Sequence, residues 1–239
     1  MIPLRDENPT RTIPFVVYGL IALNVIAFVY NGTMSLHSQN PLAGYVLVPA
    51  EIITGKDIGP MTPIAPWVTI FTSMFLHANL LHIGGNMLYL WIFGNNIEDV
   101  LGHFRFLIFY LLSGVGAALA QVSTDPGSQL PMVGASGAIA GVLSAYLVLF
   151  PRARVITLLI LIYYIQIVAL PAYTVLGFWI ILQLINSLLL RSGMFPGGGV
   201  AYAAHIGGFA SGLILVLLFG GQKLLRGRRA AEYQGRNGW

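Results

Sequence analysis

The stretch Val133-Gly134-Ala135-Ser136-Gly137-Ala138-Ile139-Ala140-Gly141 is a run of small residues that opens an apolar segment continuing to Phe150. Ser136 is expected about one helical turn inside this segment. The flanking glycines allow other backbone segments to approach closely on both sides. A serine in such a place usually caps a helix or packs between membrane helices. A further role for Ser136 depends on which polar residues the fold brings to the same depth.

Composition predicts a membrane protein. Of the 239 residues, 56% are hydrophobic and 8% are charged, and the mean hydropathy is +0.79. Soluble domains usually carry about 25% charged residues, so we expect a polytopic protein embedded in a lipid bilayer. The absence of cysteine excludes disulfides and thiolate chemistry. We expect no metal, no cofactor and no nucleic acid partner.

Apolar runs predict six membrane-spanning helices and therefore an all-α fold. About 20 apolar residues are enough to cross the hydrocarbon core of a bilayer. The expected spans are 13–30, 80–97, 104–122, 132–150, 170–190 and 200–219. Together they form a membrane domain over residues 13–220, between a polar N-terminal tail (1–12) and a basic C-terminal tail (221–239). The Pro- and Gly-rich loop 31–66 carries apolar patches and is expected to lie on the membrane surface.

The uncharged stretch 155–190 is ambiguous. As one helix it would be about 54 Å long, which exceeds a single span. Pro171 divides it, so we place the fifth span at 170–190. Residues 155–169 are then expected to lie at the inner interface as apolar chain, or to enter the membrane partly.

The distribution of Lys and Arg predicts the topology. With six spans and the N-terminus inside, ten basic residues lie on the inner side, and Lys56 and Arg191 lie outside. This follows the positive-inside rule. Two spans within 155–190 would move the five basic residues of the C-terminal tail outside, which the rule disfavours. The sequence therefore predicts cytoplasmic N- and C-termini, in a plasma (inner) membrane.

Polar residues gather at one depth of the predicted bundle. Ser136, His205 and the pair His82 and Asn86 lie in the outer third of the fourth, sixth and second spans, which all run from outside to inside. His82 and Asn86 are four residues apart and share a helix face. Polar residues are costly in hydrocarbon and usually mark a functional interior.

A hydroxyl and an imidazole from two helices can act as nucleophile and general base. His205 would take the proton of Ser136 as its oxygen attacks a carbonyl. The oxyanion that forms needs hydrogen-bond donors placed in advance, and His82, Asn86 and the amides around Ser136 can supply them. The sequence offers no obvious third member to orient His205, and it gives no reason for Asp125 in an outer loop to reach that ring.

These residues lie in motifs that resemble the rhomboid family of intramembrane serine proteases. The motifs are Gly134-Ala135-Ser136-Gly137, Ala204-His205-Ile206-Gly207-Gly208, His82-Ile83-Gly84-Gly85-Asn86 and residues 98–102, and the resemblance covers about 67–220. It implies a six-helix rhomboid-like bundle with a Ser136–His205 dyad that lacks an acid. It also implies an oxyanion hole lined by His82 and Asn86.

The resemblance further implies a water-filled cavity that opens to the outer face. Transmembrane helices would be cleaved near that face, after entering from lipid past the fifth span and the outer loops. Two positions depart from the family pattern. Val68 follows Trp67 where many members have Arg. Ala140 stands where some members stack a Tyr on the catalytic His, so His205 needs support from elsewhere.

Other polar and small residues are expected to be structural. Gly208 and Gly212 form a small-xxx-small pattern that would bring His205 towards the fourth span. Glu98 is expected to be an inner-side anchor paired with a base or with backbone. Interhelical hydrogen bonds are expected from Ser144, Gln183 and Asn186. His77 is expected at the interface, and His37 and His103 fall in loop regions without an identifiable partner.

Two alternatives to a serine protease remain open. A pseudoprotease of the same architecture would bind client helices without cutting them, although such a protein typically lacks the Ser or the His. A metalloprotease or metal transporter would use the histidines as ligands, but the sequence has no His-Glu-x-x-His run and lacks acidic ligands in its spans.

Overall fold

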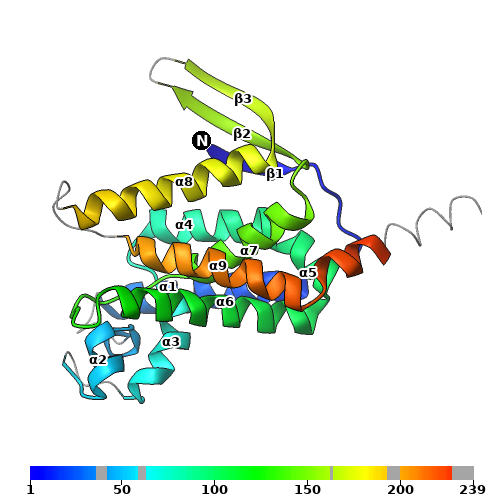
Figure 1. Ribbon diagram of the computed structural model, residues 1–239. Coiled ribbons are helices and arrows are strands. Elements are labelled where there is room, and N and C mark those ends of the chain that lie inside the picture. The colour runs from blue at the N-terminus through cyan, green and yellow to red at the C-terminus, as the bar shows by residue number, and fades with distance from the viewer. Residues whose placement is uncertain (36–41, 59–62, 162–163, 193–199, 228–239) are drawn as a thin grey trace, which may run out of the picture.

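The computed structural model describes residues 1–35, 42–58, 63–161, 164–192 and 200–227. His37 and the tail residues Arg228, Arg229 and Arg236 lie outside these ranges. The described chain is mostly helical, as predicted, and a small sheet lies at one flank of the helices (Figure 1).

Each predicted span contains a helix. They are α1 (Phe15–Ser35), α6 (His103–Thr124), α7 (Ser136–Leu149), α8 (Ala172–Arg191), α9 (Tyr202–Leu218) and the run of α4 (Leu80–Tyr89), a π-helical turn (Leu90–Gly94) and α5 (Asn95–Leu101). The short helices α2 (Pro49–Thr54) and α3 (Thr69–Thr72) lie between α1 and α4.

Among the described helices, α1, α6 and α8 are long and apolar enough to cross a membrane. A fourth span results if α9 is joined to residues 221–227 across a bend of 51°. The count of six spans therefore stays a prediction.

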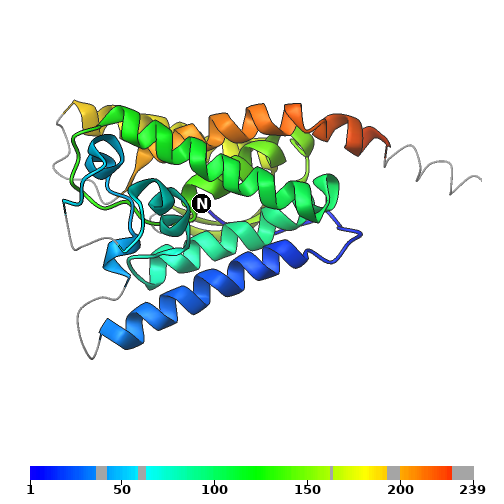
Figure 2. The same ribbon diagram turned by 90° about the horizontal axis from the view of Figure 1, so that it is seen from below.

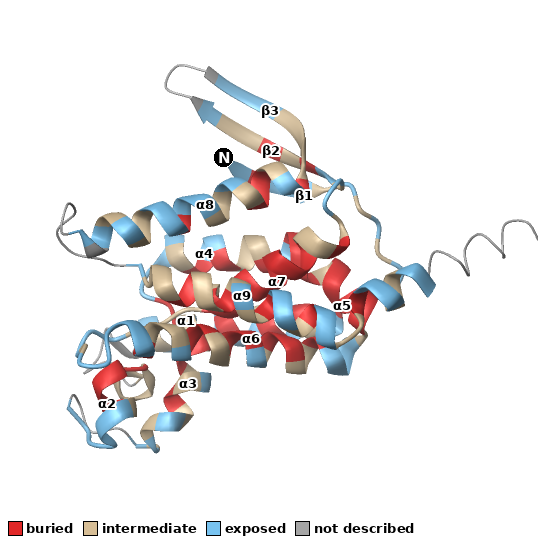
Figure 3. Ribbon diagram, in the orientation of Figure 1, coloured by how far each residue is buried: buried red, intermediate tan, exposed pale blue. Residues whose placement is uncertain are grey.

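Helix α7 lies in the middle of the bundle. Its residues are buried along almost its whole length, as the red colouring in Figure 3 shows. Helices α6 and α9 pack against it, and the view in Figure 2 shows the long helices lying side by side. With 14 residues α7 is about 21 Å long, shorter than a bilayer core. A helix enclosed by protein need not match the thickness of the lipid.

The predicted start of this span was wrong by four residues, because α7 begins at Ser136 and not at 132. Gly134 has a φ of 124°, in the region that favours glycine and cannot continue a helix. Its N–H donates to the carbonyl of Ser73 (2.9 Å), and Met132 forms an isolated bridge with Leu47. Ser136 is therefore the first residue of the helix and not one turn inside it.

A three-stranded antiparallel sheet was not predicted. It consists of β1 (Ile2–Asp6), β2 (Arg154–Leu161) and β3 (Tyr164–Pro171), in that order. Val155 pairs with Leu170 on one side and with Asp6 on the other. The expected all-α fold thus omits this sheet. Residues 155–161 and 164–169, expected as apolar chain at the inner interface or partly re-entrant, form most of two paired strands. The many β-branched residues of this stretch favour strands. Because the stretch is almost entirely apolar, it lacks the alternation of polar and apolar residues that identifies a strand in a sequence.

The sheet is fastened to the bundle on one face. Val155 and Thr157 are fully buried, and the Tyr146 hydroxyl on α7 donates to Asp6 Oδ2 (2.6 Å). The opposite face carries exposed Ile160 and Ile167. The N-terminal tail is consequently tied to the inner helix α7 through β1.

Glu98 on α5 anchors the start of α1. Pro14 precedes that helix and has no side-chain oxygen to cap it. The Glu98 carboxylate takes this role, accepting from the N–H groups of Val16 (2.9 Å) and Val17 (2.8 Å). It also pairs with His103 Nδ1 at 2.5 Å, and its side chain is fully buried. The predicted pairing of Glu98 with a base or with backbone is confirmed, and the base is His103, for which the sequence identified no partner.

Replacing Glu98 with Ala should lower the free energy of unfolding by about 3 kcal/mol, because two helix N–H groups and a histidine lose a buried charged partner. Thermal unfolding in detergent measures this effect. Glu7→Gln is the control, since Glu7 pairs with Arg154 (3.3 Å) at a largely exposed site, where about 1 kcal/mol or less is expected. Equal unfolding temperatures for the two variants would contradict the capping role.

Candidate functional site

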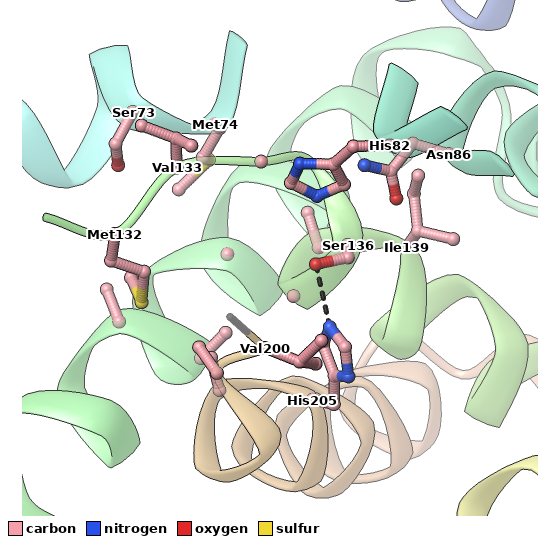
Figure 4. Close-up of a pocket in the computed structure, with 18 of the residues that line it drawn as sticks. Ser73, Met74, His82, Asn86, Met132, Val133, Ser136, Ile139, Val200 and His205 are labelled. Atoms are coloured by element: carbon pink, nitrogen blue, oxygen red, sulfur yellow. Dashed lines mark hydrogen bonds between the residues drawn. The ribbon is translucent and has the colours of Figure 1, made fainter. Parts of the chain in front are cut away.

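Ser136 and His205 contact each other in the lining of a cavity. Ser136 begins α7 and His205 lies in the first turn of α9, and both helices start at the same end of the bundle (Figure 1). Ser136 Oγ lies 2.8 Å from His205 Nε2, the contact drawn as a dashed line in Figure 4. The cavity has a volume of about 290 Å³, and His82 and Asn86 also line it. The structure thus brings together all four residues selected from the sequence.

His82 and Asn86 approach Ser136 from the side opposite His205 (Figure 4). Asn79 caps α4 by accepting from the N–H of His82 (2.9 Å), which fixes the first turn of this helix. Gly134 leaves room for the His82 ring, because a Cβ there would lie 2.7 Å from its Nε2. Within the described chain, the buried Asn86 Nδ2 has no hydrogen-bond partner. A buried donor that faces a cavity without a partner is available to a ligand.

His77 packs edge-on against His82, with ring centroids 5.0 Å apart. Burial, followed by the effect of His82, lowers the pKa of His77 to about 4. The ring is therefore neutral at pH 7. The neutral, buried ring fits the expected structural role of His77, which packs against the His82 ring.

The support for His205 comes from α8 and was missed in the sequence. Gln183 Oε1 lies 2.8 Å from His205 Nδ1, and the Trp179 ring lies 5.6 Å from the imidazole at an angle of 38°. Gln183 was expected to make an interhelical hydrogen bond, which is confirmed, and its partner, which the sequence did not identify, is His205. The available signal was the spacing of Trp179 and Gln183, four residues apart on the span that precedes His205.

Close packing of glycines holds α7 against α9. A Cβ on Gly208 would overlap the carbonyl oxygen of Gly137, and one on Gly212 would overlap the backbone of Gly141. Backbone thus meets backbone without intervening side chains. The small-xxx-small role predicted for Gly208 and Gly212 is confirmed.

The other polar residues considered in the sequence do not all lie where they were expected. Ser144 was expected to bond between helices, but its hydroxyl donates to Gly141 O (2.8 Å) within α7. Asp125 is exposed beyond the end of α6, and the described polar contacts of the His205 ring are with Ser136 and Gln183. Over the described ranges, no group of three or more His, Asp or Glu side chains is arranged to hold a metal ion.

A family model described as the Rhomboid domain matches residues 65–222. The chain belongs to the rhomboid family. It is 29% identical over 206 residues to Rhomboid protein 1, mitochondrial, of Saccharomyces cerevisiae, covering 83% of this chain and 51% of that protein. With Putative rhomboid protease YdcA of Bacillus subtilis it is 29% identical over 147 residues (60% of this chain, 68% of the relative). With Rhomboid protease AarA of Providencia stuartii it is 34% identical over 107 residues (39% and 38%).

This membership confirms the resemblance drawn from the motifs, and with the apolar helices it identifies a membrane protein. The rhomboid chain spans about half the length of the yeast relative. Organellar relatives, such as the mitochondrial yeast protein, occur beside bacterial ones, so the kind of membrane does not follow from family membership.

Substituting Gly208 with Val should loosen the α7–α9 contact, because the new side chain would overlap the Gly137 carbonyl. Overpacking of this kind costs about 1–3 kcal/mol, so amides of α7 and α9 should exchange about 10- to 100-fold faster. Hydrogen exchange in detergent, read by mass spectrometry, measures the change. Gly19→Ala on α1, where a Cβ meets nothing within 4 Å, is the matched control. Unchanged exchange in Gly208→Val would show that the glycine contact does not hold the two helices.

Proposed function

We propose that this protein is an intramembrane serine endopeptidase that cleaves transmembrane protein substrates through a Ser136–His205 dyad. The observation that carries the proposal is the 2.8 Å contact between Ser136 Oγ and His205 Nε2 in the lining of a cavity. Its relatives include proteins named as rhomboid proteases, which gives independent support.

The dyad would work by nucleophilic catalysis. Ser136 Oγ attacks the carbonyl carbon of the scissile peptide bond while its proton passes to His205 Nε2. The protonated imidazole then donates to the leaving amine, and the C–N bond breaks to leave an acyl group on Ser136. Water, deprotonated by His205, attacks this ester, the bond between the acyl carbon and Oγ breaks, and His205 returns the proton to Ser136 Oγ as the acid product leaves.

Asn86 and His82 are proposed to bind the oxyanion that forms in each step. The buried Asn86 Nδ2 lacks a partner in the described chain, so it is a donor held ready for a negative oxygen. The N-terminal end of α7 adds a favourable dipole at the same place, since Ser136 is its first residue.

Substrates are proposed to be transmembrane helices with small or helix-breaking residues, because the cut needs an extended backbone. They would enter from the lipid bilayer past α8 and the outer loops and be cut near the outer face. Ser136 and His205 lie at the starts of α7 and α9, whereas the basic residues Arg152, Lys223 and Arg226 follow the ends of the same two helices. By the positive-inside rule this favours an orientation with both termini in the cytoplasm, and we propose six spans in a plasma (inner) membrane.

Purified protein, mixed in detergent with a model transmembrane substrate, tests the proposal. The wild type should give two fragments whose masses locate the cut near the outer end of the substrate helix. Ser136→Ala should abolish cleavage. Asn86→Ala should lower kcat by about 100-fold with little change in KM, since an oxyanion donor acts mainly in the transition state.

Ser144→Ala is the matched control, because that hydroxyl lies on the same helix and bonds within it. It should cleave like the wild type. Equal cleavage by Ser136→Ala and the wild type would exclude Ser136 as the nucleophile. If cleavage persists in Ser136→Ala and also in His205→Ala, these two residues do not form the catalytic dyad.

A further inference from the structure

We propose that Gln183 on α8 is a positioning residue that sets the tautomer and orientation of the His205 ring. The proposal rests on the proposed function, since it concerns the same dyad. Gln183 would be the third residue, beside Ser136 and His205, that the sequence did not identify. It is a neutral amide where many serine proteases have an acid.

A backbone carbonyl fixes which way the Gln183 amide points. Its Nε2 donates to the carbonyl oxygen of Trp179 (3.3 Å), one turn earlier on α8. A carbonyl oxygen can only accept, so an amide turned the other way would place two acceptors against each other. The amide oxygen Oε1 must therefore face His205.

The fixed amide in turn fixes the imidazole. Oε1 can only accept, so His205 Nδ1, 2.8 Å away, must carry the ring proton. In a neutral imidazole the other nitrogen then has the free lone pair. That nitrogen, Nε2, is the one 2.8 Å from Ser136 Oγ. The hydroxyl thus donates to the base that is to remove its proton.

Burial makes this chain of hydrogen bonds effective. The exposed fractions of Gln183 and His205 are each 9%, so water competes little for Oε1 or Nδ1. The Trp179 ring lies beside the same imidazole and limits its rotation. A neutral amide orients the ring without placing an unpaired charge among apolar helices, which would be costly.

The position of Gln183 links the dyad to α8 as a whole. The other buried side chains described on this helix, Ala172, Val175 and Leu176, all lie in its first turns. Beyond them, the neighbours of Gln183 are exposed, including Ile181, Leu182 and Leu184. In the later part of α8, Gln183 is the buried residue described, and it contacts His205 of α9 together with Trp179. A displacement of this part of α8 would free Nδ1 and remove the constraint on the tautomer.

The test compares Gln183→Met, which keeps the length of the side chain but removes the acceptor, with Asn186→Leu, which removes another polar group on the same helix. Gln183→Met should lower kcat by about 10- to 100-fold and leave KM unchanged, since it alters only the base. Asn186→Leu should behave like the wild type. Gln183→Glu keeps an oxygen acceptor at the same reach and should recover most of the lost activity.

A spectroscopic measurement separates positioning from packing. In protein with ¹⁵N-labelled histidine, the wild type should show His205 protonated at Nδ1 and not at Nε2. Gln183→Met should show a mixture of tautomers, and Gln183→Glu should keep the wild-type form. Because the wild-type spectrum alone reports the tautomer, a Gln183→Met variant that fails to fold would not prevent the test.

The outcomes distinguish this proposal from the proposed function. Wild-type kcat in Gln183→Met together with cleavage lost in Ser136→Ala would overturn the role of Gln183 and leave the protease intact. If the wild type cleaves no substrate, the spectrum still decides: a proton on Nε2 overturns the proposal, and a proton on Nδ1 that is lost from Gln183→Met supports it.

Discussion

The contact between the backbones of α7 and α9 is the constraint on which the site depends. Gly137 and Gly141 on α7 face Gly208 and Gly212 on α9, four residues apart on each helix, with no room for a Cβ at either α9 glycine. Ser136 directly precedes Gly137, and His205 lies about one helical turn before Gly208, the glycine that contacts Gly137. The helix contact therefore sets the distance between hydroxyl and imidazole, and lipid offers no hydrophobic force that could replace this fit.

Helix α8 contributes in a different way. It is a largely exposed helix whose described buried apolar residues are confined to its start, and its later turns meet the bundle at Trp179 and Gln183. The aromatic ring beside His205 thus comes from α8, while position 140 on α7 is an alanine. A base supported from a peripheral helix can respond to the position of that helix, whereas the nucleophile, held within the central α7, cannot.

The sequence predicted the helices, the family and the four cavity residues because apolar runs and polar residues within them are local signals. It placed the start of α7 too early, since only the positive φ of Gly134 reveals that the chain is not yet helical. It missed the sheet because 155–170 is uncharged and almost entirely apolar, and because β1 pairs with residues about 150 positions away. It missed the Gln183–His205 bond because the spacing of Trp179 and Gln183 places them on one face of α8 but does not indicate that this face turns towards α9.

The central claim is that Ser136 is activated by His205, and covalent labelling tests it most directly. A fluorophosphonate reacts with a serine whose proton is removed by a neighbouring base. After treatment of the purified protein, peptide mapping by mass spectrometry should find one adduct, on Ser136, and this adduct should disappear in His205→Ala. An adduct on another hydroxyl, or equal labelling of Ser136 in His205→Ala, would contradict the account.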